Sequence, residues 1–162
     1  MIDLLARQTD GSLFFLKTED AVRKANRRIS AISRELSKQP PDCGLIVPCA
    51  FHENVTKALN AARTTLAMYI VEYDVYRDLL LKQGFKEVDK IAAAGRSGLE
   101  DASKLVDDSM VGALTLCGTK YDIGKQMKKF EQAGVHLIVL EPCFFEGEKL
   151  SDTIHRTIEL NG

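Results

Sequence analysis

Residues 116–143 read LCGTKYDIGKQMKKFEQAGVHLIVLEPC, and this stretch contains the clearest signals of the fold. Thr119 is placed to cap a helix, because the carboxylate of Asp122 can reach back to the cap amide from three residues later. The apolar residues that follow recur at helical spacing: Ile123, Met127 and Phe130. Gly134 is suited to the left-handed residue that ends a helix.

The segment after this predicted helix is VHLIVL, residues 135–140, which is apolar at nearly every position. Such a run is typical of a parallel strand that is buried on both faces. Gly118 and Thr119 lack the glycine density and the Lys-Ser/Thr ending of a phosphate-binding loop, so we expect a plain helix cap there. The stretch therefore predicts a helix-to-strand unit of an α/β protein.

Composition favours one globular domain over residues 1–162, since 45% of the chain is hydrophobic and 28% is charged. A formal net charge of −1 gives no attraction to nucleic acid or to anionic membranes. The sequence shows neither a membrane-spanning run nor a signal-peptide layout, so we expect a cytoplasmic protein. The cysteine spacing favours buried reduced thiols, with no metal site and no disulfide: Cys43, Cys49, Cys117 and Cys143.

Other segments extend the alternation of strands and helices along the chain. Strand patterns cover residues 11–16 and 43–51, and an amphipathic helix is predicted between them after the cap residue Thr18. A long helical excursion follows, with helices predicted near residues 54–70, 75–83, 86–94 and 99–114. The order predicts an α/β fold with about three parallel strands.

Three segments together resemble a known family: LLARQTDGSLFF (residues 4–15), YDVYRDLLLKQGF (residues 73–85) and LVDDSMVGALTLCGTKYDIGKQMKKFEQAGVHLIVLEP (residues 105–142). In this order they are similar to the C-terminal part of the bacterial-luciferase-like flavin- and deazaflavin-dependent oxidoreductases. That family includes alkanal monooxygenases and methylene-tetrahydromethanopterin reductases. The resemblance covers nearly the whole chain.

This resemblance implies a partial TIM-like barrel that comprises the last three strands or so and a helical insertion. It also implies a flavin- or deazaflavin-dependent oxidoreductase or monooxygenase module, with flavin mononucleotide or a deazaflavin coenzyme as cofactor. Because three strands cannot close an eight-stranded barrel, we expect a homo-oligomer or a partner chain that supplies the rest. The alternative is a non-catalytic, barrel-derived subunit that binds no cofactor and acts in protein association.

Ligands of parallel α/β folds collect where the strands end, which we call the mouth. This rule selects Lys17 as a binder of substrate anions, His52 as an acid or base or a substrate-binding group, and Glu141 as a partly buried proton donor or substrate-binding group. Each has an alternative interpretation as an ordinary surface or loop residue. In a barrel, the helix after Thr119 would begin at the face opposite the mouth.

A tyrosine series in the helical excursion has two interpretations. The tyrosines are Tyr69, Tyr73 and Tyr76, and they are spaced four and three residues apart, a spacing typical of one helix face. That face either lines a flavin or packs against another helix.

Overall fold

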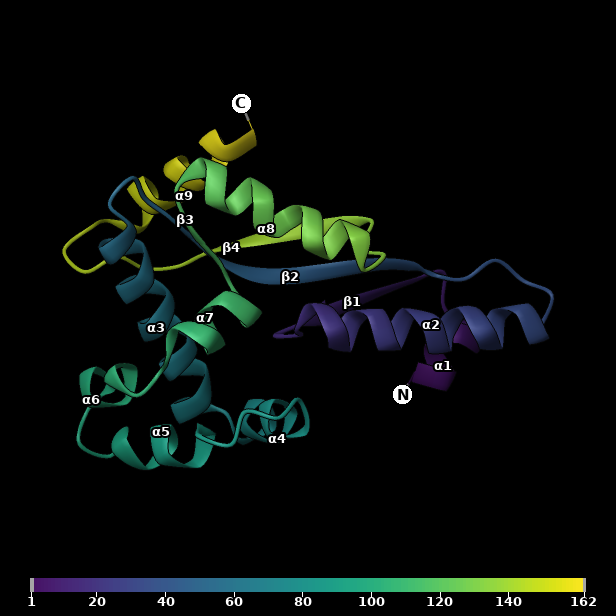
Figure 1. Ribbon diagram of the computed structural model, residues 1–162, viewed down its shortest axis with the longest axis horizontal. Coiled ribbons are helices and arrows are strands. Elements are labelled where there is room, and N and C mark those ends of the chain that lie inside the picture. The colour runs from purple at the N-terminus through teal and green to yellow at the C-terminus, as the bar shows by residue number, and fades with distance from the viewer. Residues whose placement is uncertain (1, 162) are drawn as a thin grey trace.

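The computed structural model describes residues 2–161, in which helices cover one face and the C-terminal end of a parallel sheet (Figure 1). The strands are β1 (Gly11–Phe15), β2 (Asp42–Phe51), β3 (Leu116–Gly118) and β4 (Leu137–Pro142). The helices are α1 (Ile2–Gln8), α2 (Glu19–Glu35), α3 (Val55–Glu72), α4 (Asp74–Lys82), α5 (Val88–Ala94), α6 (Leu99–Lys104), α7 (Asp108–Leu114), α8 (Lys120–Gln132) and α9 (Leu150–Ile158). A 3-10 turn, Glu159–Asn161, follows α9.

Strand β2 is the centre of the sheet, and it pairs in parallel with each of the other three strands. Cys49 lies opposite both Leu116 of β3 and Pro142 of β4, so β3 and β4 flank opposite edges of β2. Gly44 likewise lies between β1 and β4, which places β1 and β3 along the same edge. The predicted α/β fold with a parallel sheet and a helical insertion is confirmed. The sheet also contains a fourth strand, β3, whose three residues are too few to give a strand pattern.

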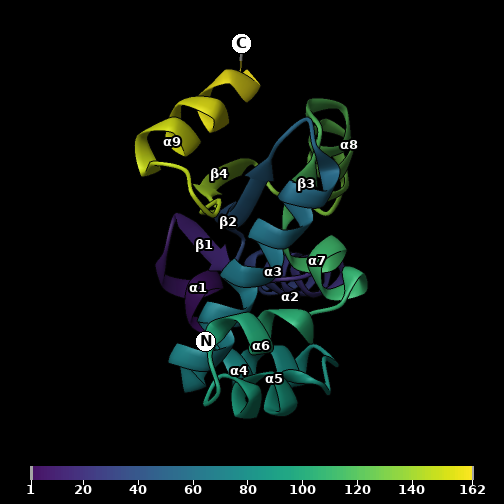
Figure 2. The same ribbon diagram turned by 90° about the vertical axis from the view of Figure 1, so that its left-hand side faces the viewer.

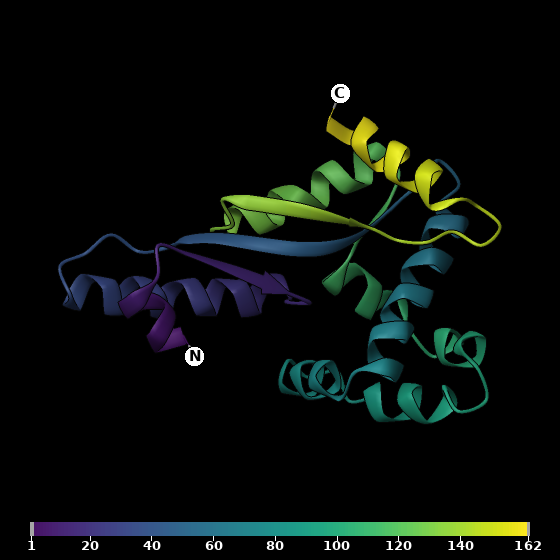
Figure 3. The same ribbon diagram turned by 180° about the vertical axis from the view of Figure 1, so that it is seen from behind.

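Helices α2 and α8 cover one face of the sheet, which we call the covered face. These helices lie in front of the strands in Figure 1 and behind them in Figure 3. Phe14, Leu45 and Val47 point to this side and form a buried cluster with apolar residues of both helices. The helix residues of the cluster are Val22, Ala25, Ile29 and Ile32 of α2, and Ile123 and Phe130 of α8.

The opposite face, the open face, is apolar yet largely uncovered near the start of the strands. Leu13, Gly44 and Leu137 lie side by side on it, and Leu13 and Leu137 are 58% and 59% exposed. Val139 is 37% exposed on the same face. The prediction that residues 135–140 form a strand buried on both faces is therefore wrong. An all-apolar pattern indicates that a strand can be buried on both faces. It does not indicate whether the described chain contains the elements that would cover both faces.

The helical excursion α3–α7 forms a second hydrophobic cluster at the C-terminal ends of the strands. Helix α3 leads away from the end of β2, and α4, α5 and α6 gather at the end of the molecule opposite α9 (Figure 2). The helix predicted over residues 99–114 is divided into α6 and α7, because Asp107 accepts a hydrogen bond from the Met110 amide and starts a new helix. Within residues 2–161, no helix is both long and apolar enough to span a membrane.

The predicted cap at Thr119 is confirmed as a capping box. The Asp122 amide donates to Thr119 Oγ1, and the Thr119 amide donates to Asp122 Oδ2 at 3.0 Å. The predicted position of this helix end is wrong, however. Since β3 runs parallel to β2 and ends at Gly118, helix α8 begins at the mouth, where the His52 amide donates to the Gly118 carbonyl at 3.1 Å.

Replacing Thr119 by alanine removes half of this capping box. We expect Thr119→Ala to lower the free energy of unfolding by about 1 kcal/mol, as measured by urea denaturation. Thr56→Ala is the control, because Thr56 is exposed in the first turn of α3 and should shift stability by less than about 0.5 kcal/mol. Equal effects of the two substitutions would contradict the assigned cap.

Candidate functional site

The three residues chosen from the sequence all lie at the mouth, where β1, β2 and β4 end. Lys17 follows β1, His52 follows β2, and Glu141 is the penultimate residue of β4. Among the described residues, no hydrogen bond or ion pair joins any two of them. Each instead has its own surroundings. Glu141 and His52 each lie beside groups that form hydrogen bonds with them.

Glu141 lies on the open face and is bound by a tyrosine from the helical excursion. Its register opposite Pro48 places it on the same side of the sheet as Val139. The Tyr69 hydroxyl, on α3, donates a hydrogen bond to Glu141 Oε1. Burial raises the pKa of Tyr69, and the hydrogen bond to Glu141 raises it further, so the phenol remains a donor at neutral pH.

The second carboxylate oxygen, Glu141 Oε2, is buried and has no hydrogen-bond partner within the described part of the chain. A buried polar atom without a partner is uncommon, because leaving it unpaired costs free energy. Such an atom next to a mouth is therefore an acceptor available to a ligand. Glu141 is partly buried at the mouth, as in one of its two interpretations from the sequence.

Tyr69, which binds this carboxylate, belongs to a cluster of aromatic rings. The Phe15 ring meets Tyr69 edge-on at a centroid distance of 5.0 Å and Tyr76 at 5.3 Å. Tyr73 contacts Tyr69 and Tyr76 as well, and it is 50% exposed. Tyr69 on α3 thus packs against Tyr76 on α4 as well as against Phe15 at the end of β1, and the exposed Tyr73 leaves one side of the aromatic cluster facing solvent.

Lys17 is held in a strained turn by a residue that the sequence did not single out. Gln83, at the end of α4, donates from Nε2 to the Leu16 carbonyl at 2.9 Å and accepts from the Thr18 amide at 2.9 Å. These bonds secure Leu16 in a left-handed backbone conformation, with φ of 48°. Burial lowers the pKa of the Lys17 ammonium, and Lys82 lowers it further.

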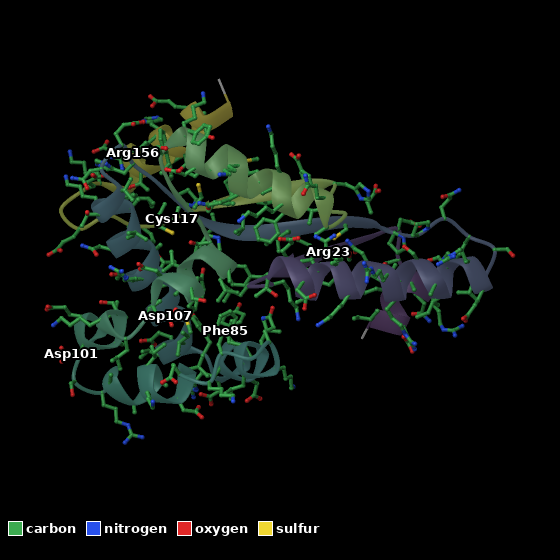
Figure 4. All side chains as sticks on the ribbon, in the orientation of Figure 1. Arg23, Phe85, Asp101, Asp107, Cys117 and Arg156 are labelled. Atoms are coloured by element: carbon green, nitrogen blue, oxygen red, sulfur yellow. The ribbon has the colours of Figure 1, made fainter. Side chains whose placement is uncertain are left out.

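His52 contacts residues that follow β4. Its Nδ1 accepts a hydrogen bond from the Asn54 amide at 2.8 Å, and its Nε2 lies 4.0 Å from Glu148 Oε1. Arg156, on α9, donates from Nη2 to Glu148 Oε2 at 2.5 Å and lies at the end of the molecule toward which the strands run (Figure 4). No signal local to His52 in the sequence indicates this cluster, because its members come from three separate segments.

The four cysteines are free and buried. Burial raises the pKa of Cys49 to about 12 and that of Cys117 to about 11, and it also raises the pKa of Cys143. A buried thiol with a raised pKa is a poor nucleophile.

The parallel sheet, the mouth at its C-terminal edge and the helical excursion define part of a barrel-type α/β protein. A family model described as luciferase-like monooxygenase matches residues 1–137, and the chain belongs to that family. No curated protein matches the sequence.

The solved structures that are similar to the chain include two F420-dependent enzymes. The first is a coenzyme F420-dependent tetrahydromethanopterin reductase from Methanopyrus kandleri, with a TM-score of 0.78 and 19% identity. The match covers 97% of this chain and 46% of that one. The second is an F420-dependent secondary alcohol dehydrogenase in complex with an F420-acetone adduct, with a TM-score of 0.58 and 16% identity, covering 86% of this chain and 39% of that one. The chain thus spans less than half the length of either protein, and these likenesses establish the fold.

The Tyr69–Glu141 bond gives a pH-dependent prediction. Tyr69→Phe removes a donor to a buried carboxylate, so we expect a loss of about 2 kcal/mol of stability at neutral pH. A raised tyrosine pKa stabilises the fold below about pH 10, and this contribution decreases as the pH rises further. The difference between Tyr69→Phe and the unchanged chain should therefore narrow above about pH 10 in urea unfolding.

The control for this experiment is Tyr121→Phe, since Tyr121 is 77% exposed. This variant should follow the unchanged chain at every pH. A stability difference for Tyr69→Phe that stays constant into the alkaline range would rule out the assigned role of the Tyr69 proton.

Proposed function

We propose that this chain is an oxidoreductase module that binds a flavin-type coenzyme, a deazaflavin or flavin mononucleotide, at the mouth. The observation that carries the proposal is the buried, unpaired Glu141 Oε2 beside the solvent-facing aromatic cluster. Membership of the luciferase-like monooxygenase family supports the class of chemistry. The two similar solved proteins are described as F420-dependent, which favours a deazaflavin as the coenzyme.

The residues present fit one side of a flat aromatic ligand. Phe15, Tyr69 and Tyr76 offer apolar ring surface, and aromatic rings contact one another favourably edge-on or offset. Glu141 Oε2 would accept a hydrogen bond from an N–H group of such a ligand, while Tyr69 keeps Oε1 occupied and the carboxylate oriented. The bound coenzyme would supply hydride or oxygen transfer, and these residues would position it.

The open face supports the further proposal that additional barrel strands complete the site. We propose that they come from a partner chain or a second copy, because the chain corresponds to 46% of the similar reductase. Leu13, Leu137 and Val139 would then be buried in the barrel interior.

A cofactor titration tests the proposed function. We expect the assembled protein to bind the deazaflavin coenzyme or flavin mononucleotide saturably, as followed by fluorescence. Glu141→Gln keeps the size of the side chain but removes its charge, so binding should weaken by about tenfold. Glu146→Gln, at an exposed glutamate in the loop after β4, is the matched control and should bind normally. Absence of binding to both cofactors by the folded, assembled protein would refute the proposal.

The second candidate function is a non-catalytic subunit that acts in protein association. The exposed Leu13 and Leu137 on the open face favour it, because adjacent apolar side chains of this size on a sheet commonly mark an interface. This reading requires the same surface to be covered but assigns no ligand to the mouth.

Solution mass tests the role of the open face in either function. Leu137→Glu places a charge at its centre, and we expect it to reduce the assembled mass toward that of the single chain. Leu105→Glu is the control, since Leu105 is 46% exposed in the excursion, away from the sheet. An unchanged mass for Leu137→Glu, or an equal effect of both variants, would exclude the open face as the interface.

A further inference from the structure

A charged cluster at the mouth is separate from the Glu141–Tyr69 pair. His52 follows β2, Glu148 lies in the loop between β4 and α9, and Arg156 lies on α9. The Glu148 carboxylate lies between the two basic side chains, with Oε2 2.5 Å from Arg156 Nη2 and Oε1 4.0 Å from His52 Nε2. Two cationic or donor groups therefore converge on one anionic position.

Arg156 has hydrogen-bonding capacity that the described chain does not use. Its Nη1 is buried and has no partner there, although a guanidinium can bind an oxyanion through two parallel hydrogen bonds. The guanidinium carbon lies 4.8 Å from the centroid of the Phe145 ring, which supports the cation from one side. The orphaned donor is thus held in place rather than free to turn toward water.

His52 is oriented to donate toward the same position. Because the Asn54 amide donates to His52 Nδ1, the neutral imidazole carries its proton on Nε2, the atom that faces Glu148. The Phe145 ring also packs against the imidazole, at a centroid distance of 5.6 Å. Phe145 therefore fixes both basic side chains around Glu148.

The N-terminal end of α3 adds partial positive charge near the cluster of His52, Glu148 and Arg156. Helix α3 spans Val55–Glu72 and begins three residues after His52, so its N-terminal end adjoins the cluster. Free backbone amides and the helix dipole favour an anion near such an end. Gly147 precedes Glu148 with a φ of 77°, a backbone conformation that glycine adopts without strain.

We propose that Arg156 and His52 form a binding site for the phosphate group of a ligand, and that the Glu148 carboxylate occupies the phosphate position in its absence. Arginine binds carboxylates and phosphates with the same planar arrangement of donors. A phosphate dianion carries more charge than Glu148, so it displaces the carboxylate and pairs with Arg156 Nη1. The inference stands on this cluster alone and holds whether or not the chain binds a flavin.

Calorimetric titration with inorganic phosphate tests this site. Glu148→Gln removes the competing charge, so we expect phosphate to bind this variant about tenfold more tightly than the unchanged chain. Adding Arg156→Gln to the Glu148→Gln variant should weaken its phosphate binding by at least about tenfold. Acetate, with a single charge, should bind Glu148→Gln more weakly than phosphate does.

A second probe, glycerol phosphate, distinguishes the sources of the phosphate. Binding as tight as that of inorganic phosphate identifies a phosphorylated small molecule as the ligand class, and tighter binding of inorganic phosphate identifies the free ion. Both results support the site, whereas failure of Glu148→Gln to bind either probe more tightly than the unchanged chain would overturn it.

Arg63→Gln is the matched control for the arginine. Arg63 also pairs with a carboxylate at 2.5 Å, that of Asp108, and is 29% exposed against 23% for Arg156. The Arg63→Gln substitution should leave phosphate binding unchanged. A loss of phosphate affinity equal to that caused by Arg156→Gln would contradict the site. The unchanged chain gives an independent readout, because phosphate should raise its Tm and Arg156→Gln should abolish that rise.

Discussion

Pairing with β2 is the constraint on which the rest of the structure depends. Every other strand of the described sheet is hydrogen-bonded to it, and each pair is parallel. Parallel strands all end at the same edge, so segments far apart in the sequence reach a common place. The positions that follow the strands, such as His52, and the last residues within them, such as Glu141, gather there for this reason alone.

The two faces of the sheet show how one strand can serve stability and function at once. In β4, Ile138 and Leu140 pack into the core beneath α8, whereas Val139 and Glu141 point to the open face. The alternation of side chains along a strand makes this division unavoidable. The open face can therefore vary toward a ligand or a partner while the covered face keeps the fold.

Local features were predictable from the sequence, and features that join distant segments were not. The capping box of Thr119 and Asp122 depends on residues three apart, so the sequence predicts it. The rule that ligands collect at strand ends likewise selected His52 and Glu141. Tyr69 lies 72 residues from Glu141, however, and Gln83 lies 67 residues from Leu16, so nothing local indicates either contact. The exposure of Leu137 was missed because an apolar pattern does not specify what covers it.

The two hydrogen bonds of Gln83 connect the helical excursion to the backbone that follows β1 at the mouth. A displacement of α4 must either break both bonds or carry the backbone from Leu16 to Thr18 with it. Leu16 holds a conformation that is unfavourable for its residue type, so once released this backbone would relax to a different path. The helical excursion thus fixes the position of the backbone that follows β1. An insertion or deletion in α4 would therefore change the position of Lys17 without altering any residue of the sheet.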